Sequence, residues 1–338
     1  MRRIRIEWAR LGSSRRDGEI AEMATTSSVT PAASLSSTTS LVQVEDLTKR
    51  YGSSRGVEDV SFAIRDGEVF GFLGPNGAGK TTTIRTLMGL LRPTAGRSVI
   101  GGLDCWAQAP EVKRLVGYLP GEFSFDPGLT GAQILTYLAN LRGGVDHAYL
   151  TQLVERLELD PSRRFREYSR GNKQKVGLAQ AFMGKPRLLI LDEPTSGLDP
   201  LNQQEFYKLV AETRADGRSI FLSSHILPEV EHTCDRVGII REGKLVKVGG
   251  VGELRDLRQR VLEAQFSGPA EAAWFSGLPG VLSVTTDEPS TARVTLTGDM
   301  AEALRVAVEH GALNVVTHEP SLEDIFLRYY EPVSEPVA

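Results

Sequence analysis

This chain of 338 residues has few cysteines, few aromatic residues and no long apolar segment. Its two cysteines, Cys105 and Cys234, are too few for a disulfide framework or a cysteine-based metal cluster, so we expect two inert thiols in a reducing compartment. No uninterrupted apolar run reaches about 18 residues, and we therefore expect no membrane-spanning helix. The formal net charge of −4 excludes an overall basic character of the kind that nucleic-acid-binding proteins carry.

The first 40 residues also lack the pattern of a folded domain. Arginine is frequent up to Arg16 without the apolar core of a signal peptide, and residues 25–40 are rich in Ser and Thr. We expect residues 1–40 to form a disordered extension, with Met23 as an alternative start. From Leu41 onward the mixture of apolar and charged residues is ordinary for a globular protein.

The strongest motif matches the phosphate-binding pattern G-x-x-x-x-G-K-[ST]. Glycines let backbone N–H groups curl around phosphate oxygens, while Lys80 is suited to the β- and γ-phosphates and Thr81 to Mg²⁺. An apolar strand is expected before the motif at residues 68–73, and a helix after it that ends near residue 91. The predicted phosphate-binding residues are Gly74, Pro75, Asn76, Gly77, Ala78, Gly79, Lys80, Thr81 and Thr82.

A second motif follows the continuous apolar run 187–191, which predicts a buried parallel strand ending in Asp192 and Glu193. Beside a phosphate loop, Asp192 is suited to hold Mg²⁺ through water and Glu193 to polarise an attacking water. Taken alone, the pair is equally well explained as two acidic residues at a strand end. The phosphate loop earlier in the chain favours the catalytic interpretation.

The rest of the chain alternates between strand and helix patterns. We predict a domain at residues 41–254 with a helical subdomain at about 122–183, a small α+β domain at 255–331 and a tail at 332–338. In the first domain, strands are expected at 41–45, 57–64, 98–100, 115–119, 187–191, 219–223 and 236–240, and helices at 130–157 with a break at Gly143–Gly144, 171–183, 202–215 and 226–234. In the second, strands are expected at 261–266, 281–285 and 292–296 and helices at 300–309 and 322–330.

These motifs, in this order over about residues 41–250, resemble the ATP-binding cassette (ABC) ATPases. The resemblance implies an α/β fold of the P-loop NTPase class, with a mixed sheet and an α-helical subdomain. It implies that Tyr51 stacks on adenine and that His225 contacts the γ-phosphate, so that Lys80, Glu193 and His225 are the catalytic residues. A tyrosine at a strand end is the alternative for Tyr51, and a packing residue is the alternative for His225.

Residues 168–172 resemble the family's signature loop, in which Ser169 and Gly171 would meet the γ-phosphate bound by a second subunit. Tyr168, Arg170 and Asn172 depart from the usual Leu-Ser-Gly-Gly-Gln, and without the resemblance Ser169 is a plain helix cap. Asp199 lies in a loop that resembles the one crossing between paired nucleotide-binding domains, and the same loop also starts a helix with Pro200.

One departure affects the metal site. The family usually has Gln after the strand at 115–119, but here that place is held by Gly121, which has no side chain to bind Mg²⁺. The next residue, Glu122, is therefore our candidate metal ligand beside Thr81 and Asp192. Because Glu193 and His225 are both present, we still expect hydrolysis.

The resemblance is nearest to ATP-binding subunits that are separate from their membrane subunits, above all in exporters of drugs and antibiotics; the end region 320–330 also resembles theirs. It implies the ligands ATP and Mg²⁺, a membrane-spanning permease partner, a second ATP-binding subunit in a homodimer or heterodimer, and a place at the cytoplasmic face of the membrane. Phe123 and Phe125 are candidate permease contacts, with core packing as the alternative.

Two other functions stay open at this point. A soluble ABC ATPase acting on the ribosome or on nucleic acid usually has two cassettes or long insertions, and neither is visible in this sequence, so we expect no nucleic acid as a partner. The second is a P-loop GTPase or kinase, but the Asn-Lys-x-Asp guanine motif is absent and the elements around Ser169 and His225 would then have no explanation. The sequence does not indicate the cargo, because in such transporters specificity lies in the membrane partner.

Overall fold

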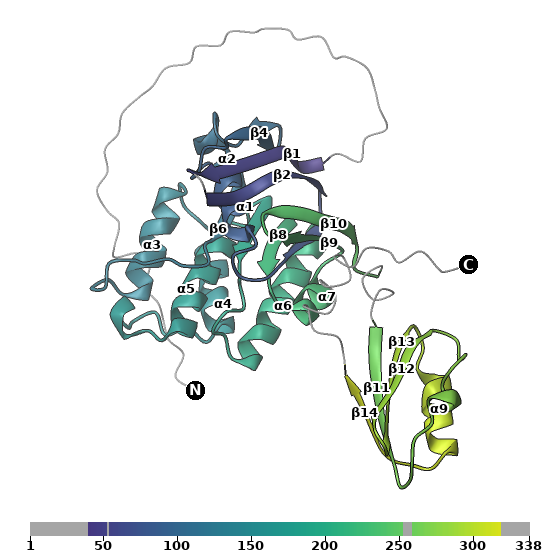
Figure 1. Ribbon diagram of the computed structural model, residues 1–338. Coiled ribbons are helices and arrows are strands. Elements are labelled where there is room, and N and C mark those ends of the chain that lie inside the picture. Colours follow the sequence, from purple (N-terminus) through teal and green to yellow (C-terminus); the bar gives the residue numbers. More distant parts are fainter. Residues whose placement is uncertain (1–39, 53, 253–258, 319–338) are drawn as a thin grey trace, which may run out of the picture.

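The computed structural model describes residues 40–52, 54–252 and 259–318 (Figure 1). The predicted N-terminal extension up to residue 39, the predicted helix at 322–330 and the tail lie outside the described residues. Within them the chain forms three β-sheets and a set of mostly short helices, which confirms the predicted α/β class.

A six-stranded sheet forms the centre, in the order β10-β9-β3-β8-β7-β6. Its strands are parallel except for β10, which forms an antiparallel hairpin with β9. Parallel strands place all their carboxyl ends at one edge, where ligands bind in such sheets. The six strands are β3 (Val69–Leu73), β6 (Val116–Leu119), β7 (Leu188–Asp192), β8 (Ser219–Ser224), β9 (Arg236–Arg241) and β10 (Lys244–Gly250).

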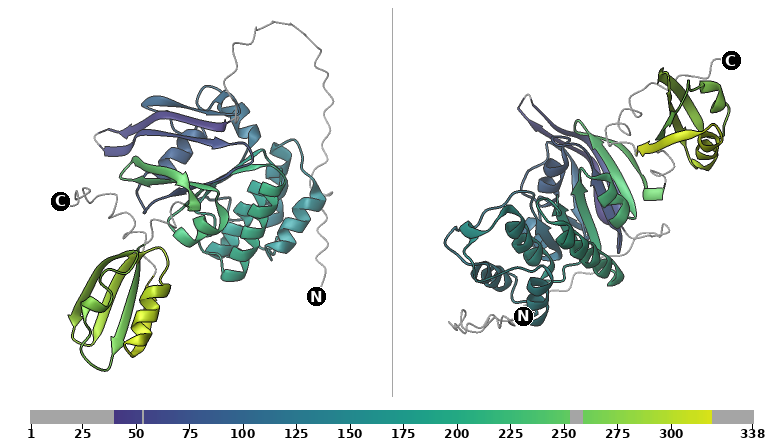
Figure 2. Two further views of the ribbon diagram at one scale, coloured as in Figure 1. Left: turned by 90° about the vertical axis from the view of Figure 1, so that its right-hand side faces the viewer. Right: turned by 90° about the horizontal axis from the view of Figure 1, so that it is seen from below.

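An antiparallel sheet of order β2-β1-β4-β5 packs against one face of the central sheet, and helices α5, α6 and α7 cover the other, with α3 and α4 packed against α5 (Figures 1 and 2). Its strands are β1 (Ser40–Tyr51), β2 (Ser54–Arg65), β4 (Ala95–Ile100) and β5 (Leu103–Asp104). The helices of this part are α1 (Lys80–Leu87), α2 (Ala109–Leu115), α3 (Gly131–Leu141), α4 (His147–Arg156), α5 (Arg170–Phe182), α6 (Pro200–Ala215) and α7 (Leu227–Thr233).

Strand β7 shows why its sequence is apolar at every position. Leu188 and Ile190 pack into the hydrophobic cluster shared with the antiparallel sheet, while Leu189 and Leu191 pack into the cluster shared with the helices. Successive side chains of a strand point to opposite faces, so a strand covered on both faces needs apolar residues throughout. The prediction of a buried parallel strand is confirmed.

The helix boundaries follow local signals. Gly143 and Gly144, with φ of 83° and 104°, separate α3 from α4, as predicted. Helix α1 ends at Leu87, earlier than predicted, because Gly89 takes a left-handed φ of 61° that turns the chain after the last helical residue. The seven-residue helix α2 was not predicted, since it is too short to show a clear periodicity.

Residues 259–318 form a separate antiparallel sheet of order β12-β13-β11-β14, with its own hydrophobic cluster. The three predicted strands and the helix are present, but β14 was not predicted. The domain boundary near residue 254 stays a prediction, because residues 253–258 are not described. The elements are β11 (Gln259–Phe266), the 3-10 turn η3 (Ala272–Trp274), β12 (Val281–Glu288), β13 (Thr291–Thr297), α9 (Ala301–Glu309) and β14 (Ala312–His318).

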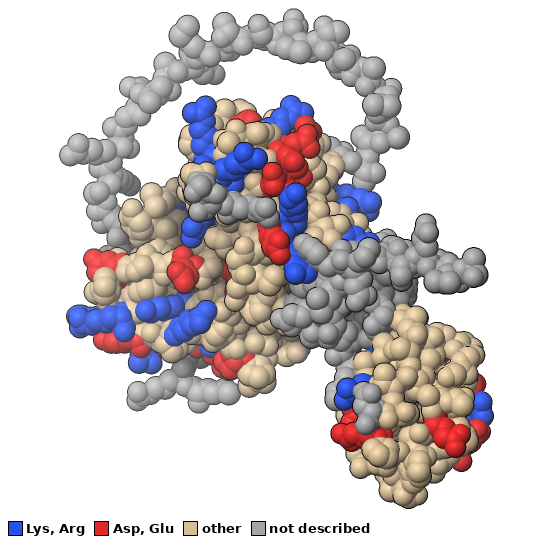
Figure 3. All heavy atoms as spheres, in the orientation of Figure 1, with Lys and Arg blue, Asp and Glu red and all other residues tan. Residues whose placement is uncertain are grey.

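The surface carries both signs of charge. On the face shown in Figure 3, Lys and Arg side chains alternate with Asp and Glu rather than gathering in one patch. Among the described residues, no helix has the length and apolarity needed to cross a membrane.

Candidate nucleotide-binding and catalytic site

The loop of residues 74–79 joins the end of β3 to the start of α1, as predicted. Gly77 and Gly79 have φ of 79° and 110°, a region that side chains disfavour, and at Gly74 a Cβ atom would lie 2.3 Å from the carbonyl oxygen of Ile240. No side chain caps the N-terminus of α1, so its backbone N–H groups and helix dipole are available to an anion. The loop therefore has the geometry of a phosphate site.

The lysine of this loop is buried and already paired. Lys80 is only 5% exposed, and its Nζ donates to the carbonyl oxygens of Gly74 at 2.6 Å and Pro75 at 3.1 Å. The same Nζ lies 3.1 Å from Glu193 Oε1. A buried ammonium group needs such partners, and here they place its charge between the phosphate loop and the predicted catalytic carboxylate.

Asp192, at the end of β7, is fully buried and accepts two hydrogen bonds. Thr81 Oγ1 donates to one carboxylate oxygen at 2.8 Å, and Ser223 Oγ donates to the other at 2.5 Å. Ser223 was not predicted, although its place directly opposite Asp192 in the parallel pair of β7 and β8 brings it there. The Thr81 hydroxyl and Asp192 carboxylate are hard oxygen donors and fit Mg²⁺, which also keeps water ligands.

Glu193 follows β7 with a left-handed backbone conformation. Its φ of 51° is unusual for a residue with a side chain and costs about 1–3 kcal/mol. In this conformation the carboxylate of Glu193 lies between two partners: Oε1 faces Lys80, and Oε2 lies 2.7 Å from His225 Nδ1. The structure thus brings together Lys80, Glu193 and His225, the three residues predicted to be catalytic.

Two adjoining cavities share Asn76, Thr81 and Glu193. The first, of 370 Å³, is also lined by Arg85, Gly121, Glu122, Arg170, Asp192, Ser196 and His225. The second, of 230 Å³, is also lined by Tyr51, Gly56, Pro75, Gly77, Gly79, Lys80 and Thr82. Most of the predicted nucleotide- and metal-binding residues therefore border one continuous depression. Arg85 was not predicted because it belongs to no motif, and Ser196 was not predicted although it lies in the same predicted loop as Asp199.

Tyr51 lines the second cavity and Glu122 the first. Tyr51 ends β1 and is 43% exposed, and Lys49 Nζ lies 5.5 Å from the centroid of its ring. Stacking of this ring on a base stays a prediction. Glu122 is exposed next to Gly121, whose Cβ position would lie 3.2 Å from Asp192 Oδ2. Glu122 is thus near the predicted metal ligands, but its role as a ligand stays a prediction.

Ser169, Gly171 and Asp199 lie outside both cavities. Ser169 caps α5 by accepting from the N–H of Asn172 at 3.3 Å, and Asp199 caps α6 by accepting from the backbone and side chain of Asn202 at 3.0 and 2.7 Å. These hydrogen bonds lower the pKa of the Asp199 carboxyl. Each residue has a local structural role in the single chain, and contact with a partner's nucleotide stays a prediction.

Tyr168 explains one departure from the signature pattern. Its ring is buried against Phe165, its hydroxyl donates to the carbonyl oxygen of Asp160 at 2.6 Å, and burial raises its pKa to about 12. Phe123 and Phe125 are partly buried in the same aromatic group, with ring centroids 5.8 Å apart. Core packing therefore accounts for much of both rings, and their contact with a permease stays a prediction.

A buried carboxyl beside the site was also missed. Glu229 on α7 is 2% exposed, and it accepts a hydrogen bond from Ser224 Oγ at 2.5 Å. Burial raises its pKa to about 7. The carbonyl oxygen of Ser224 accepts from the N–H of Gly74 at 3.2 Å, so this group links α7 to the start of the phosphate loop.

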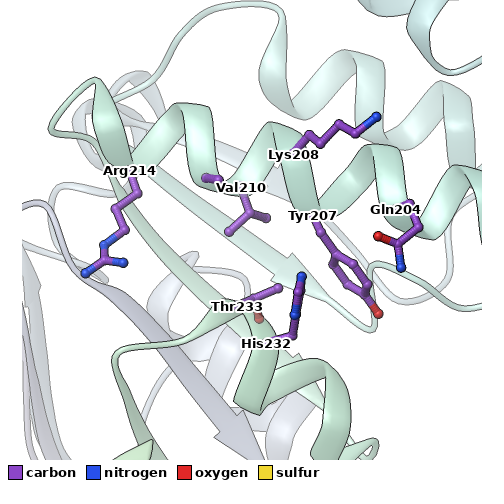
Figure 4. A pocket seen from close by; sticks show the side chains of 8 residues that line it. Gln204, Tyr207, Lys208, Val210, Arg214, His232 and Thr233 are labelled. Atoms are coloured by element: carbon purple, nitrogen blue, oxygen red, sulfur yellow. The ribbon is translucent and has the colours of Figure 1, made fainter.

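A further hollow of 230 Å³ lies between α6 and α7 (Figure 4). The rings of Tyr207 and His232 meet there with centroids 5.0 Å apart. Lys208 and Arg214 point in different directions in Figure 4, and they pair with Glu205 and Asp235 respectively. The polar groups of this hollow do not converge on one point, unlike those at the phosphate loop.

Residues 57–196 match the family model described as ABC transporter. The chain is 34% identical to the bacitracin transport ATP-binding protein BcrA of Bacillus licheniformis over 295 residues, which cover 85% of this chain and 96% of that protein. It is 31% identical to the linearmycin resistance ATP-binding protein LnrL of Bacillus subtilis (strain 168), over 85% of this chain and 97% of that one. These relatives favour the transporter interpretation over a ribosome- or nucleic-acid-dependent ATPase.

Solved structures agree on the fold. A structure described as the ATP-binding subunit of an ABC transporter is 33% identical to the chain, with a TM-score of 0.59 over 64% of this chain and 92% of that one. A dimeric cassette, MJ0796, bound to ADP and Pi has a TM-score of 0.56 over 62% of this chain and 98% of that one, and at 21% identity it supports the fold alone.

Proposed function

The chain belongs to the ABC transporter ATP-binding proteins, and we propose that it powers the export of a drug, an antibiotic or another small hydrophobic molecule through a separate membrane-spanning subunit. As a member of this family, the chain binds and hydrolyses ATP. The export of such molecules is suggested by the names of its relatives, which include bacitracin transport and linearmycin resistance proteins. The observation that carries the ATPase part of the proposal is the meeting of Lys80, Glu193 and His225 at the phosphate loop.

In the proposed reaction, each residue has one task. The backbone N–H groups of the loop and Lys80 hold the phosphates, and Tyr51 stacks on the base. Glu193 orients the attacking water and accepts its proton, because its carboxylate is fixed at the cavity wall between two cationic or hydrogen-bonding partners. His225 holds that carboxylate through Nδ1 and lines the same cavity, where it is placed to contact the γ-phosphate.

We assign Mg²⁺ to Thr81 and Asp192, with Glu122 as a further ligand in place of the absent glutamine. The two oxygen donors already lie 2.8 Å apart, which supports this assignment. The ion would neutralise charge on the phosphates during transfer. Ser223 would keep the carboxylate of Asp192 oriented toward it.

We further propose that two chains bind two ATP molecules between them, head to tail, as a homodimer. Ser169 and Gly171 of one chain would then contact the ATP held by the phosphate loop of the other. Their place at the start of α5, outside the chain's own cavities, supports this arrangement. Hydrolysis removes the charge that both chains share and loosens the interface, which would drive the membrane subunit.

The membrane partner would hold the chain at the cytoplasmic face of the cell membrane. Pull-down of the full chain from solubilised membranes tests this directly. We expect a membrane-spanning protein to copurify and the candidate cargo to stimulate ATP hydrolysis. Recovery of ribosomes or nucleic acid instead of a membrane protein would contradict the proposal.

A further inference from the structure

The side chain of Gln174 forms hydrogen bonds with the backbone of Glu193, the predicted catalytic carboxylate, and of Pro194. Gln174 lies in the second turn of α5 and is 5% exposed. Its Nε2 donates to the carbonyl oxygen of Glu193 at 3.1 Å and to that of Pro194 at 3.0 Å. An amide nitrogen has two N–H groups, so it can serve both carbonyls at once and fix the direction of the chain between them.

The other backbone hydrogen bonds of Glu193 come from β8 and from its own loop. Its N–H donates to the carbonyl oxygen of Ser223 on β8 at 3.2 Å and to Ser223 Oγ at 3.1 Å, and its carbonyl oxygen also accepts from the N–H of Ser196 at 3.2 Å. With Gln174 included, the N–H of Glu193 is held by β8, and its carbonyl oxygen is held by α5 and by Ser196. This explains how a residue with a φ of 51° is kept in that conformation.

Helix α5 contacts the same segment at two further points. Arg170 Nη2 donates to Ser196 Oγ at 2.8 Å. A Cβ atom on Gly171 would lie 2.4 Å from the carbonyl oxygen of Gly197, so the helix and the segment touch with no room for a side chain. The first two turns of α5 therefore lie directly against residues 193–197, and Gln174 is the buried polar contact among them.

We propose that Gln174 is a positioning residue of the ATPase reaction, which holds the backbone of Glu193 so that its carboxylate lies between Lys80 and His225. The inference rests on the proposed function, because it takes Glu193 as the group that activates the water. It also extends that function. Since α5 begins at the residues assigned to the partner's ATP, one helix joins both half-sites of the chain.

The experiment compares two glutamines of α5 in the full chain. Gln180 Nε2 also donates to a backbone carbonyl, that of Tyr118, but does not touch residues 193–197, so Gln180→Met is the matched control for Gln174→Met. We expect Gln174→Met to lower kcat by about 10²-fold with an almost unchanged KM for ATP, since a displacement of about 1 Å has this cost. Gln180→Met is expected to keep nearly the wild-type kcat. The kcat values are normalised to the concentration of protein that binds nucleotide, so that unfolded protein does not lower them.

A double variant links the effect to the carboxylate. In a Glu193→Gln background, Gln174→Met is expected to cause no further loss, because the group that it positions is already gone. A wild-type kcat in Gln174→Met, an equal loss in Gln180→Met, or a full additional loss in the double variant would each overturn the inference. Normal turnover in Glu193→Gln alone would instead overturn the proposed role of Glu193. Should Gln174→Met not fold, Gln174→Asn decides: a reduced kcat at constant KM supports the inference, and a wild-type kcat overturns it.

Discussion

The region around the central six-stranded sheet and the sheet of residues 259–318 differ in whether they bury polar and charged side chains. The central part buries Lys80, Asp192, Gln174 and Glu229 around the carboxyl ends of its parallel strands. Within residues 259–318, the buried side chains that the structure describes are all apolar, and charged groups pair at the surface, as Arg293 does with Glu263 at 2.9 Å.

This difference indicates which region serves the reaction and which serves stability. Burying a charged or polar group costs free energy unless it is paired, so a part of the chain that buries many of them retains them for a task other than stability. A part whose core is wholly apolar is stabilised by packing alone. Substitutions in the first region should change activity most, and substitutions in the second should change stability alone.

The largest expected effect is that of Glu193→Gln. Removing the group that accepts the proton should lower kcat by about 10²–10⁴-fold and let an ATP-bound dimer accumulate. Phosphate release and size-exclusion chromatography with ATP measure both. The control is Glu302→Gln on α9, an exposed carboxylate of the other region, which should turn over normally. The assignment of Glu193 fails if this variant stays monomeric with ATP while the wild-type chain dimerises.

The next largest effect is on the stability of residues 259–318. Phe275 is fully buried in the cluster of the small sheet, and Phe275→Ala should cost about 3–5 kcal/mol of stability in that sheet. Hydrogen exchange of residues 259–318 should report this loss, while kcat stays at the wild-type value. Val308→Ala, at a position 69% exposed on α9, serves as the control with little loss. A large fall in kcat in Phe275→Ala would mean that the small sheet supports the active site.

A smaller, pH-dependent effect is expected at Glu229. Burial raises its pKa from 4.5 to about 7, so the folded chain holds this proton more tightly than the unfolded chain does. The stability that follows is complete below the unfolded pKa and is lost as the pH rises through the folded one. The glutamine of Glu229→Gln cannot ionise. At about pH 8 the free energy of unfolding of this variant should therefore be about 1–3 kcal/mol larger than that of the wild type, and the difference should disappear at low pH. Denaturant titrations across this range measure it, and a gap that does not change with pH would contradict the prediction.

The smallest effect tests the substitute for the missing glutamine. If Glu122 is a metal ligand, Glu122→Ala should raise the Mg²⁺ concentration needed for half-maximal hydrolysis by about tenfold. A Mg²⁺ titration of ATPase activity is the measurement, with Glu111→Ala on α2 as a carboxylate control outside the cavity. Unchanged Mg²⁺ dependence and turnover would remove Glu122 from the site.

Prediction from sequence worked best where one local segment contains the whole signal. The phosphate loop was readable because its glycines and lysine are adjacent, and β7 was readable because it is covered on both faces. It failed at β14, which has no regular alternation and is defined by its pairing with β11, and at the end of α1, where Gly89 turns the chain. It also missed Ser223 and Gln174, since their partners lie about 20 to 30 residues away in the chain.

The type of chemistry can be read along the chain: a phosphate loop, two carboxylates at a strand end and a histidine after the next strand. Each of these depends on residue types and on their spacing. How these groups meet depends on the folded arrangement. The pairing of β7 with β8 places Ser223 against Asp192, and the packing of α5 on residues 193–197 brings Gln174 to the backbone of Glu193. Such contacts arise from the register of strands and the docking of helices, which no local pattern specifies.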